Sequence, residues 1–264
     1  MQQNIIFLGT GQGSQVVGKQ LRASGGIVIQ SGEHQLHLDP GPGSLNMGKI
    51  CGINPRATTA LLVSHSHLRH CNDLNLQIDA MTYSGLDKRG VLIADDALIN
   101  QGGVSEFYKG CLEKYMVLKP GQKVAIDDIE IKATTTSHSV QGIGFKILAP
   151  SFCVSYLGDT GFCSEILEEH AGTEIMILNV VNPANMKSDN NLNSEDAIKI
   201  IRKLKPNLAI ITHFSLKMLE ADPIQEARNI NSQTKSQVIA AKDGMVINPL
   251  GYASKSRQKR LDAF

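Results

Sequence analysis

Short apolar runs recur along the whole chain, and many are rich in valine and isoleucine and bounded by glycine, proline, aspartate or asparagine. Runs of this kind are typical of β-strands. Strand pairs dominate the early and late parts of the chain, with helical patterns between some of them. Thirteen strands are predicted, at residues 5–8, 26–30, 35–38, 60–63, 91–94, 124–126, 129–133, 144–148, 153–157, 175–180, 208–211, 238–240 and 246–248.

Three segments show the periodicity of helices instead. Apolar residues spaced by three and four positions follow Asp73, whose side chain suits a helix N-cap. A second apolar stripe over residues 197–204 follows Ser194, which suits the same role. Residues 218–232 predict a third helix, which Pro223 interrupts near its start.

These elements predict an α/β fold in which two mixed β-sheets pack face to face with helices outside, a four-layer αββα sandwich. The chain has 264 residues, and we expect one domain that spans residues 1–264. The net charge of +1 gives no overall attraction to nucleic acid or membranes. No apolar stretch approaches the ~20 residues that span a bilayer. Five cysteines without C-x-x-C spacing, and no signal-like N-terminus, favour the reducing cytoplasm.

The strongest chemical signal is a run of three histidines within six residues. His65, His67 and His70 come directly after the apolar residues 60–63. Imidazoles at positions i and i+2 beyond a strand end can converge on one cation. Arg69 lies inside the run, and its permanent positive charge is unusual beside a metal. The run therefore predicts a metal site that departs from the ordinary pattern.

Further polar residues follow other predicted strands, at Asp39, His138, Asp159 and His213. Residues at the ends of several strands gather at one rim of a sheet, where functional sites usually form. Each of these residues alone is more often a hydrogen-bonding or capping group. Taken together with the histidine run, and in this order along the chain, they predict a metal centre.

This order of motifs resembles the metallo-β-lactamase fold superfamily, and within it the ribonuclease Z-like and related small hydrolases. The resemblance extends from residue 8 to residue 213, and the glycine-rich segment 7–13 is similar to the first-strand turn of that group. The family motif H-x-H-x-D-H is matched here except that Arg69 replaces the aspartate. Asp39 matches an early aspartate that supports the site through hydrogen bonds.

The resemblance implies a first metal position built from His65, His67 and His138, with Asp159 bridging to a second position. Three imidazoles and a carboxylate suit a tetrahedral Zn²⁺ ion. One Zn²⁺ is therefore expected, with Mn²⁺ or Fe²⁺ as the alternatives.

The second position would use His70, His213 and the shared Asp159, but it lacks its own aspartate. Arg69 cannot be deprotonated in a protein and so cannot bind a cation. At ~4 Å two like unit charges repel by about 4 kcal/mol at an effective dielectric of roughly 20, and a divalent ion doubles this. An inward Arg69 would weaken the second position, or would replace its metal by pairing with Asp159 or with a substrate phosphate. An outward side chain would leave the position half-liganded.

Family chemistry implies hydrolysis by a metal-bound hydroxide of a small phosphodiester or ester-type substrate. Asp159 would orient the nucleophile, while Arg69 and His213 would neutralise developing negative charge. Asn191 stands near the slot in which related enzymes carry a proton-donating histidine. Only twenty residues separate His138 from Asp159, which leaves no room for an arm that binds transfer RNA. Transfer RNA is therefore disfavoured as a substrate.

Two other hypotheses remain. The departures at Arg69 and Asn191 favour a catalytically impaired family member that acts as a binding or regulatory protein. In the second hypothesis, the histidines are structural residues of an ordinary α/β domain. A homodimer is an expectation by analogy with similar proteins only.

Overall fold

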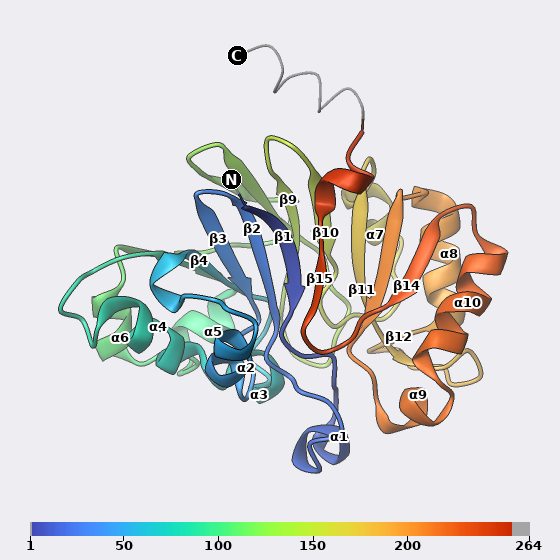
Figure 1. Ribbon diagram of the computed structural model, residues 1–264, viewed down its shortest axis with the longest axis horizontal. Coiled ribbons are helices and arrows are strands. Elements are labelled where there is room, and N and C mark those ends of the chain that lie inside the picture. Colours follow the sequence, from blue (N-terminus) through green and yellow to red (C-terminus); the bar gives the residue numbers. More distant parts are fainter. Residues whose placement is uncertain (1, 255–264) are drawn as a thin grey trace. The chain divides into compact units, whose positions relative to one another are not determined.

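The computed structural model describes residues 2–254, which fall into two compact units (Figure 1). Unit 1 comprises the chain up to Leu118 together with Val140–Gly142 and Lys242–Asn248. Unit 2 comprises Lys119–Ser139, Ile143–Ala241 and the chain from Pro249 onward. Each unit is built around its own β-sheet. The expectation of a single domain stays a prediction.

The sheet of unit 1 has seven strands in the order β15-β1-β2-β3-β4-β5-β6. Strands β15, β1, β2 and β3 pair antiparallel, whereas β3 to β6 run parallel. Parallel pairing places the carboxyl ends of β3, β4 and β5 at one edge. The strands are β1 (Gln2–Phe7), β2 (Ile27–Gly32), β3 (His34–Leu38), β4 (Thr58–Val63), β5 (Val91–Ala94), β6 (Lys114–Val117) and β15 (Met245–Ile247).

Helices α3 to α6 share one hydrophobic cluster with β4 and β5. Leu61 and Leu92 come from the strands, and Leu74, Ile78 and Leu98 from the helices, and all five are fully buried. The cluster fixes α3, the helix that carries His70, against the sheet. The helices of unit 1 are α1 (Ser14–Gly18), α2 (Ser44–Ile50), α3 (Leu68–Cys71), α4 (Leu74–Thr82), α5 (Asp96–Asn100) and α6 (Glu106–Cys111), with a 3₁₀ turn at Pro55–Ala57.

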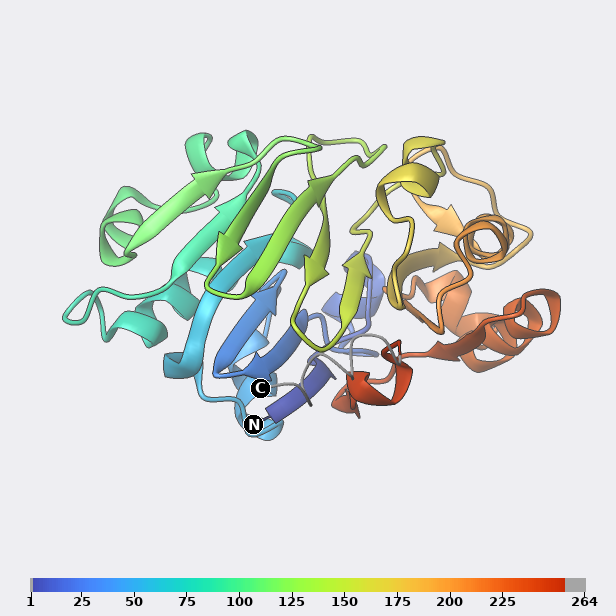
Figure 2. The same cartoon turned by 90° about the horizontal axis from the view of Figure 1, so that it is seen from above.

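The sheet of unit 2 has eight strands, seven of them in the order β14-β13-β11-β10-β9-β8-β7, and β12 pairs with β11. Strands β7 to β10 form antiparallel pairs, visible in green in Figure 2, whereas β10, β11, β13 and β14 run parallel. The strands are β7 (Lys123–Ile126), β8 (Ile129–Thr134), β9 (Gly144–Leu148), β10 (Cys153–Tyr156), β11 (Ile175–Asn182), β12 (Leu192–Asn193), β13 (Leu208–Thr212) and β14 (Gln237–Ala240).

Helices α7 (Glu165–Glu169), α8 (Ser194–Leu204), α9 (Leu216–Glu220) and α10 (Pro223–Gln233) belong to unit 2, with a 3₁₀ turn at Pro249–Tyr252. Buried side chains of all four helices and of β11, β13 and β14 form a second hydrophobic cluster. Its packing holds the parallel strands whose carboxyl ends carry Asp159 and His213.

The predicted elements agree closely with the structure, since each of the thirteen expected strands overlaps an observed one. Two mixed sheets with helices confirm the expected fold class. Strands β6 and β12 were not predicted, because β6 mixes polar and apolar residues and β12 has only two residues.

The helix ends differ in detail. The expected cap Ser194 is wrong by one position, because the Asn193 side chain accepts the hydrogen bond from the backbone of Asp196. Pro223 starts a separate helix, since its missing N–H is harmless in a first turn. No helix within residues 2–254 is long and apolar enough to cross a bilayer. The basic segment 255–260 lies outside the described residues.

Candidate metal centre

In unit 1, the parallel pairing of β3 with β4 brings Asp39 close to Ser64. Leu38 pairs with Leu62, so the residues just beyond the two strand ends lie side by side. Asp39 has a positive φ of 49°, a left-handed conformation that aspartate tolerates better than most residues. Such a conformation is costly, and it recurs at functional sites.

The Asp39 carboxylate accepts three hydrogen bonds inside unit 1. The Ser64 N–H and Ser64 hydroxyl donate at 2.6 and 2.7 Å, and His70 Nδ1 donates at 2.7 Å. Asp39 is only 3% exposed. Because hydrogen bonds to a buried charge are stronger than neutral ones, this carboxylate stabilises both the turn after β4 and the helix α3.

The same network determines the histidine tautomers. The Ser64 hydroxyl uses its proton on Asp39, so His65 Nδ1, 2.9 Å from Ser64 Oγ, is the donor of that contact. A neutral imidazole that donates from Nδ1 carries its lone pair on Nε2. The partners of His65 and His70 therefore set both rings in the tautomer that binds a metal through Nε2.

His65 and His67 present adjacent nitrogens. His65 Nε2 lies 2.9 Å from His67 Nδ1, and the two rings meet edge to face. Two ligands of a tetrahedral ion, each about 2.0–2.1 Å from it, are separated by roughly 3.3 Å. A small opening of this pair therefore admits one ion, and the donor set suits zinc.

Arg69 lies on α3, immediately before His70. Its Nε is buried and makes no hydrogen bond to any residue between 2 and 254. A buried guanidinium N–H without an acceptor is unfavourable unless a ligand oxygen supplies one. The backbone at Arg69 packs tightly, because its carbonyl oxygen occupies the place where a side chain at Gly41 would lie.

In unit 2, Asp159 follows β10 and has a histidine beside each of its two oxygens. His213 Nε2 lies 3.2 Å from Oδ1, and His138 Nε2 lies 3.9 Å from Oδ2. Asn179, on the neighbouring strand β11, donates to Asp159 Oδ1 at 2.8 Å. Asp159 is 2% exposed, so this amide compensates part of the cost of burying the carboxylate.

The backbone contributes to the placement of both histidines of unit 2. His138 Nδ1 lies 2.7 Å from the carbonyl oxygen of Asn190, so Nδ1 is the donor and the lone pair is on Nε2. His213 follows β13 with a positive φ of 68°, a second left-handed residue at a strand end. His138 thus presents Nε2 as a candidate ligand, as His65 and His70 do in unit 1.

Two groups near the site, the His37 ring and the Cys71 thiol, have structural roles. Burial lowers the pKa of His37 to about 4, and its Nε2 lies 3.0 Å from Ser44 Oγ, so this ring is neutral at pH 7. Burial, with the Asp39 charge adding to it, raises the pKa of Cys71 to about 12. The Cys71 thiol is therefore protonated and donates to the carbonyl oxygens of Ser66 and His67. Cys71 therefore fills space in the core and is not suited to act as a nucleophile.

The structure groups the predicted residues into two sets, His65, His67 and His70 in unit 1 and His138, Asp159 and His213 in unit 2. That both sets bind the same ions stays a prediction, as do the catalytic roles.

Sequence reasoning missed Ser64, Asn179 and the carbonyl of Asn190. Asn179 could have been recognised from the sequence, because it is a polar residue inside the apolar strand 175–181. Ser64 and the Asn190 carbonyl had no such signal, because their partners depend on the folded chain. Asn191, expected near a proton-donor slot, has its Oδ1 buried without a hydrogen bond to the described residues.

A family model described as "Beta-lactamase superfamily domain" matches residues 34–214. An uncharacterized protein of Methanocaldococcus jannaschii is 35% identical over 95% of this chain and 96% of its own length. The metallo-β-lactamase fold protein YhfI from Bacillus subtilis has a TM-score of 0.78 at 19% identity, covering 92% of this chain and 98% of that one. A diphosphatase from the PhnP family has a TM-score of 0.69 at 16% identity, covering 93% and 97%.

Proposed function

The chain belongs to the β-lactamase superfamily and has the metallo-β-lactamase fold of metal-dependent hydrolases, and on this premise we propose that it hydrolyses a small phosphodiester or ester-type substrate. The observation that carries the proposal is the tautomer of three of the histidines. His65, His70 and His138 each donate from Nδ1 to an acceptor in their own unit, which leaves the lone pair on Nε2.

We propose that His65, His67, His138 and Asp159 hold one divalent ion, with Zn²⁺ expected and Mn²⁺ or Fe²⁺ as alternatives. His213 would complete a second position with His70 and Asp159. The donor types support this, since imidazole and carboxylate are the usual zinc ligands. A bound ion of this kind would lower the pKa of the water it holds and polarise the scissile group.

The chain's own side chains would orient the attacking water and neutralise negative charge on the substrate. Asp159, held by Asn179, would accept a proton from the attacking water and fix its direction. Arg69, whose buried Nε has no acceptor among the described residues, would bind an anionic oxygen of the substrate. The Asn191 carboxamide cannot deliver a proton, so a good leaving group is the expected preference.

The chain segment between His138 and Asp159 supports a small substrate rather than transfer RNA. Residues 139–158 contain β9 and β10 with short connecting loops. The similar fold of a PhnP-family diphosphatase favours phosphoryl chemistry.

The test is metal loading followed by hydrolysis of bis(p-nitrophenyl) phosphate. Purified protein reconstituted with Zn²⁺, Mn²⁺ or Fe²⁺ should retain about one ion per chain and hydrolyse the substrate. The variant His67→Ala should lose about 100-fold or more in kcat/KM, as expected when a metal ligand is removed. His34→Ala is the matched control, because His34 lies on β3 outside both sets of ligands. Less than about half an ion per chain together with no hydrolysis would overturn the proposal.

A second candidate function is a binding or regulatory role without turnover, which the cation at position 69 favours. The variant Arg69→Asp restores the family motif. For a lightly modified hydrolase, we expect it to raise the metal content toward two ions per chain and to change the rate. If neither changes, and the wild-type protein binds metal without hydrolysing any diester, the non-catalytic role is the better account.

A further inference from the structure

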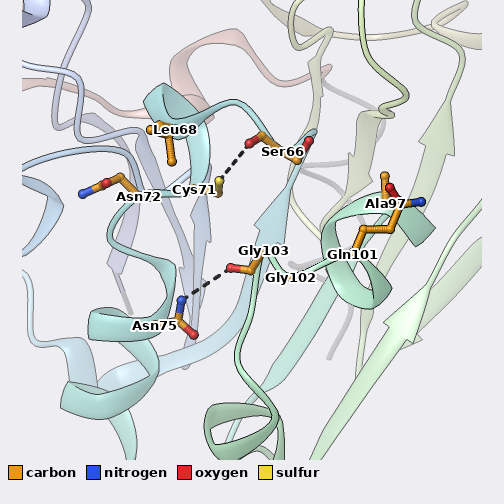
Figure 3. Close-up of a pocket in the computed structure, with 9 residues that line it drawn as sticks. All are labelled: Ser66, Leu68, Cys71, Asn72, Asn75, Ala97, Gln101, Gly102 and Gly103. Atoms are coloured by element: carbon orange, nitrogen blue, oxygen red, sulfur yellow. Dashed lines mark hydrogen bonds between the residues drawn. The ribbon is translucent and has the colours of Figure 1, made fainter.

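Unit 1 contains a cavity of about 420 Å³ that the catalytic proposal does not use (Figure 3). It lies between the segment that carries the histidine run and the segment that follows β5. Gln101 and Ala97 lie on one side in Figure 3, and Leu68 and Asn72 on the other. The remaining lining residues are Ser66, Cys71, Asn75, Gly102 and Gly103.

The cavity adjoins the candidate ligands of unit 1. Ser66, one of its lining residues, is the single residue between His65 and His67. Leu68 follows His67 directly and is 69% exposed at the rim. A substrate held at these histidines therefore has this cavity next to its reacting group.

The chemistry of the lining is neutral and polar. None of the nine lining residues carries a formal charge, and three of them are carboxamides, Asn72, Asn75 and Gln101. Such a lining does not attract a phosphate, which needs cations or a cluster of N–H donors. A fully apolar group would cover the Gln101 carboxamide without giving it hydrogen bonds. The lining thus fits a neutral group that both donates and accepts, as a carboxamide does itself.

The three carboxamides differ in how they are held. Asn75 is engaged at both ends, because its Nδ2 donates to Gly103 O at 3.4 Å and its Oδ1 accepts from the Ser105 N–H at 3.0 Å. Asn72 Nδ2 donates to Asp73 Oδ1 at 3.0 Å. The exposed Gln101 side chain has no hydrogen bond to any other described residue. Gln101 is therefore the carboxamide with both of its functions available for a ligand.

We propose that this cavity is a substrate subsite that binds a neutral, hydrogen-bonding part of the substrate, and that Gln101 selects it. The neutral part is a nucleobase or a sugar, which share paired donors and acceptors. A carboxamide recognises a nucleobase edge by accepting and donating side by side. The placement of the subsite beside the reacting group rests on the proposed hydrolase function, whereas binding of the neutral group does not.

Direct binding tests the subsite without turnover. 1-Methylthymine and methyl 2-deoxy-β-ribofuranoside are titrated separately into the full-length protein and followed by ligand-observed NMR, so that the two arms separate base from sugar. At least one should bind, and Gln101→Leu should weaken it about 3- to 10-fold, the effect of one or two neutral hydrogen bonds. Gln225→Leu is the matched control, an exposed glutamine on α10 outside the cavity. Its affinity should equal that of the wild type.

Kinetics links the subsite to the reaction. In the zinc-loaded protein, kcat/KM is compared for thymidine 5′-(p-nitrophenyl phosphate) and bis(p-nitrophenyl) phosphate. The kcat/KM of the thymidine substrate divided by that of bis(p-nitrophenyl) phosphate should fall about 3- to 10-fold in Gln101→Leu, because KM for the thymidine substrate rises. The same ratio should stay constant in Gln225→Leu. No binding of either neutral probe, or equal binding by Gln101→Leu and wild type, would overturn the subsite even if hydrolysis is found. Binding that depends on Gln101 without any hydrolysis would support the subsite and overturn the hydrolase function.

Discussion

Replacement of Asp39 should damage both folding stability and metal binding, because one carboxylate supports two parts of the unit 1 site. It accepts from the backbone and hydroxyl of Ser64 and from His70 Nδ1. Each hydrogen bond to a buried charge contributes about 1.5–3 kcal/mol. The gross loss of about 4.5–9 kcal/mol in Asp39→Ala is reduced by relaxation, so we expect a net loss of about 3–5 kcal/mol.

The isosteric change Asp39→Asn isolates the charge. One amide oxygen still accepts, but the NH₂ group must face either the Ser64 N–H or the pair formed by the Ser64 hydroxyl and His70, so one side of the network loses its acceptor. We expect a loss of about 2–3 kcal/mol in the free energy of unfolding and a 10- to 100-fold loss in metal affinity. Urea denaturation at pH 7.5 measures the first quantity, and competition with a chelator measures the second.

Asp243→Ala is the matched control for these variants. Asp243 accepts from Thr10 Oγ1 at 2.7 Å and from the Ala23 N–H at 2.8 Å, but it contacts none of the candidate ligands. It should lose about 1–3 kcal/mol of stability with unchanged metal affinity. If Asp39→Asn stays within about 0.5 kcal/mol of wild type and holds metal equally well, the proposed support by Asp39 is refuted.

Three further outcomes are expected. Asn179→Ala removes the N–H that holds Asp159 and should weaken metal binding about 10- to 100-fold in chelator competition, whereas an unchanged affinity would exclude a positioning role. Burial, aided by two nearby lysines, lowers the pKa of His170 to about 3, so the unfolded chain takes up its proton first and stability is lost as pH falls below about 6.5. The loss should be about 2 kcal/mol at pH 5, and His170→Leu should flatten the pH dependence of urea midpoints between pH 7.5 and 5; a parallel dependence would contradict this. Gly41→Ala places a methyl group against the Arg69 carbonyl and should lower Tm by several degrees with loss of metal, and a neutral effect would show that the contact relaxes freely.

The sequence alone located the elements and the chemical groups. Strand alternation and turn residues are local properties, so all thirteen expected strands are found, whereas the short β12 escapes such a signal. Likewise, His65 and His67 converge because two residues at i and i+2 beyond a strand project to the same side. The order of the remaining histidines and aspartates carried the family resemblance that the family model later confirmed.

Only the tertiary structure decided what each of these groups can do. Asp39 lies 25 residues from Ser64 and 31 from His70, and Asn190 lies 52 residues from the ring of His138 whose tautomer it sets. A tautomer, a buried charge or a cavity depends on partners that meet through sheet pairing and helix packing. No local pattern encodes such partners, because the same residue types occur at many positions where the fold brings nothing to them.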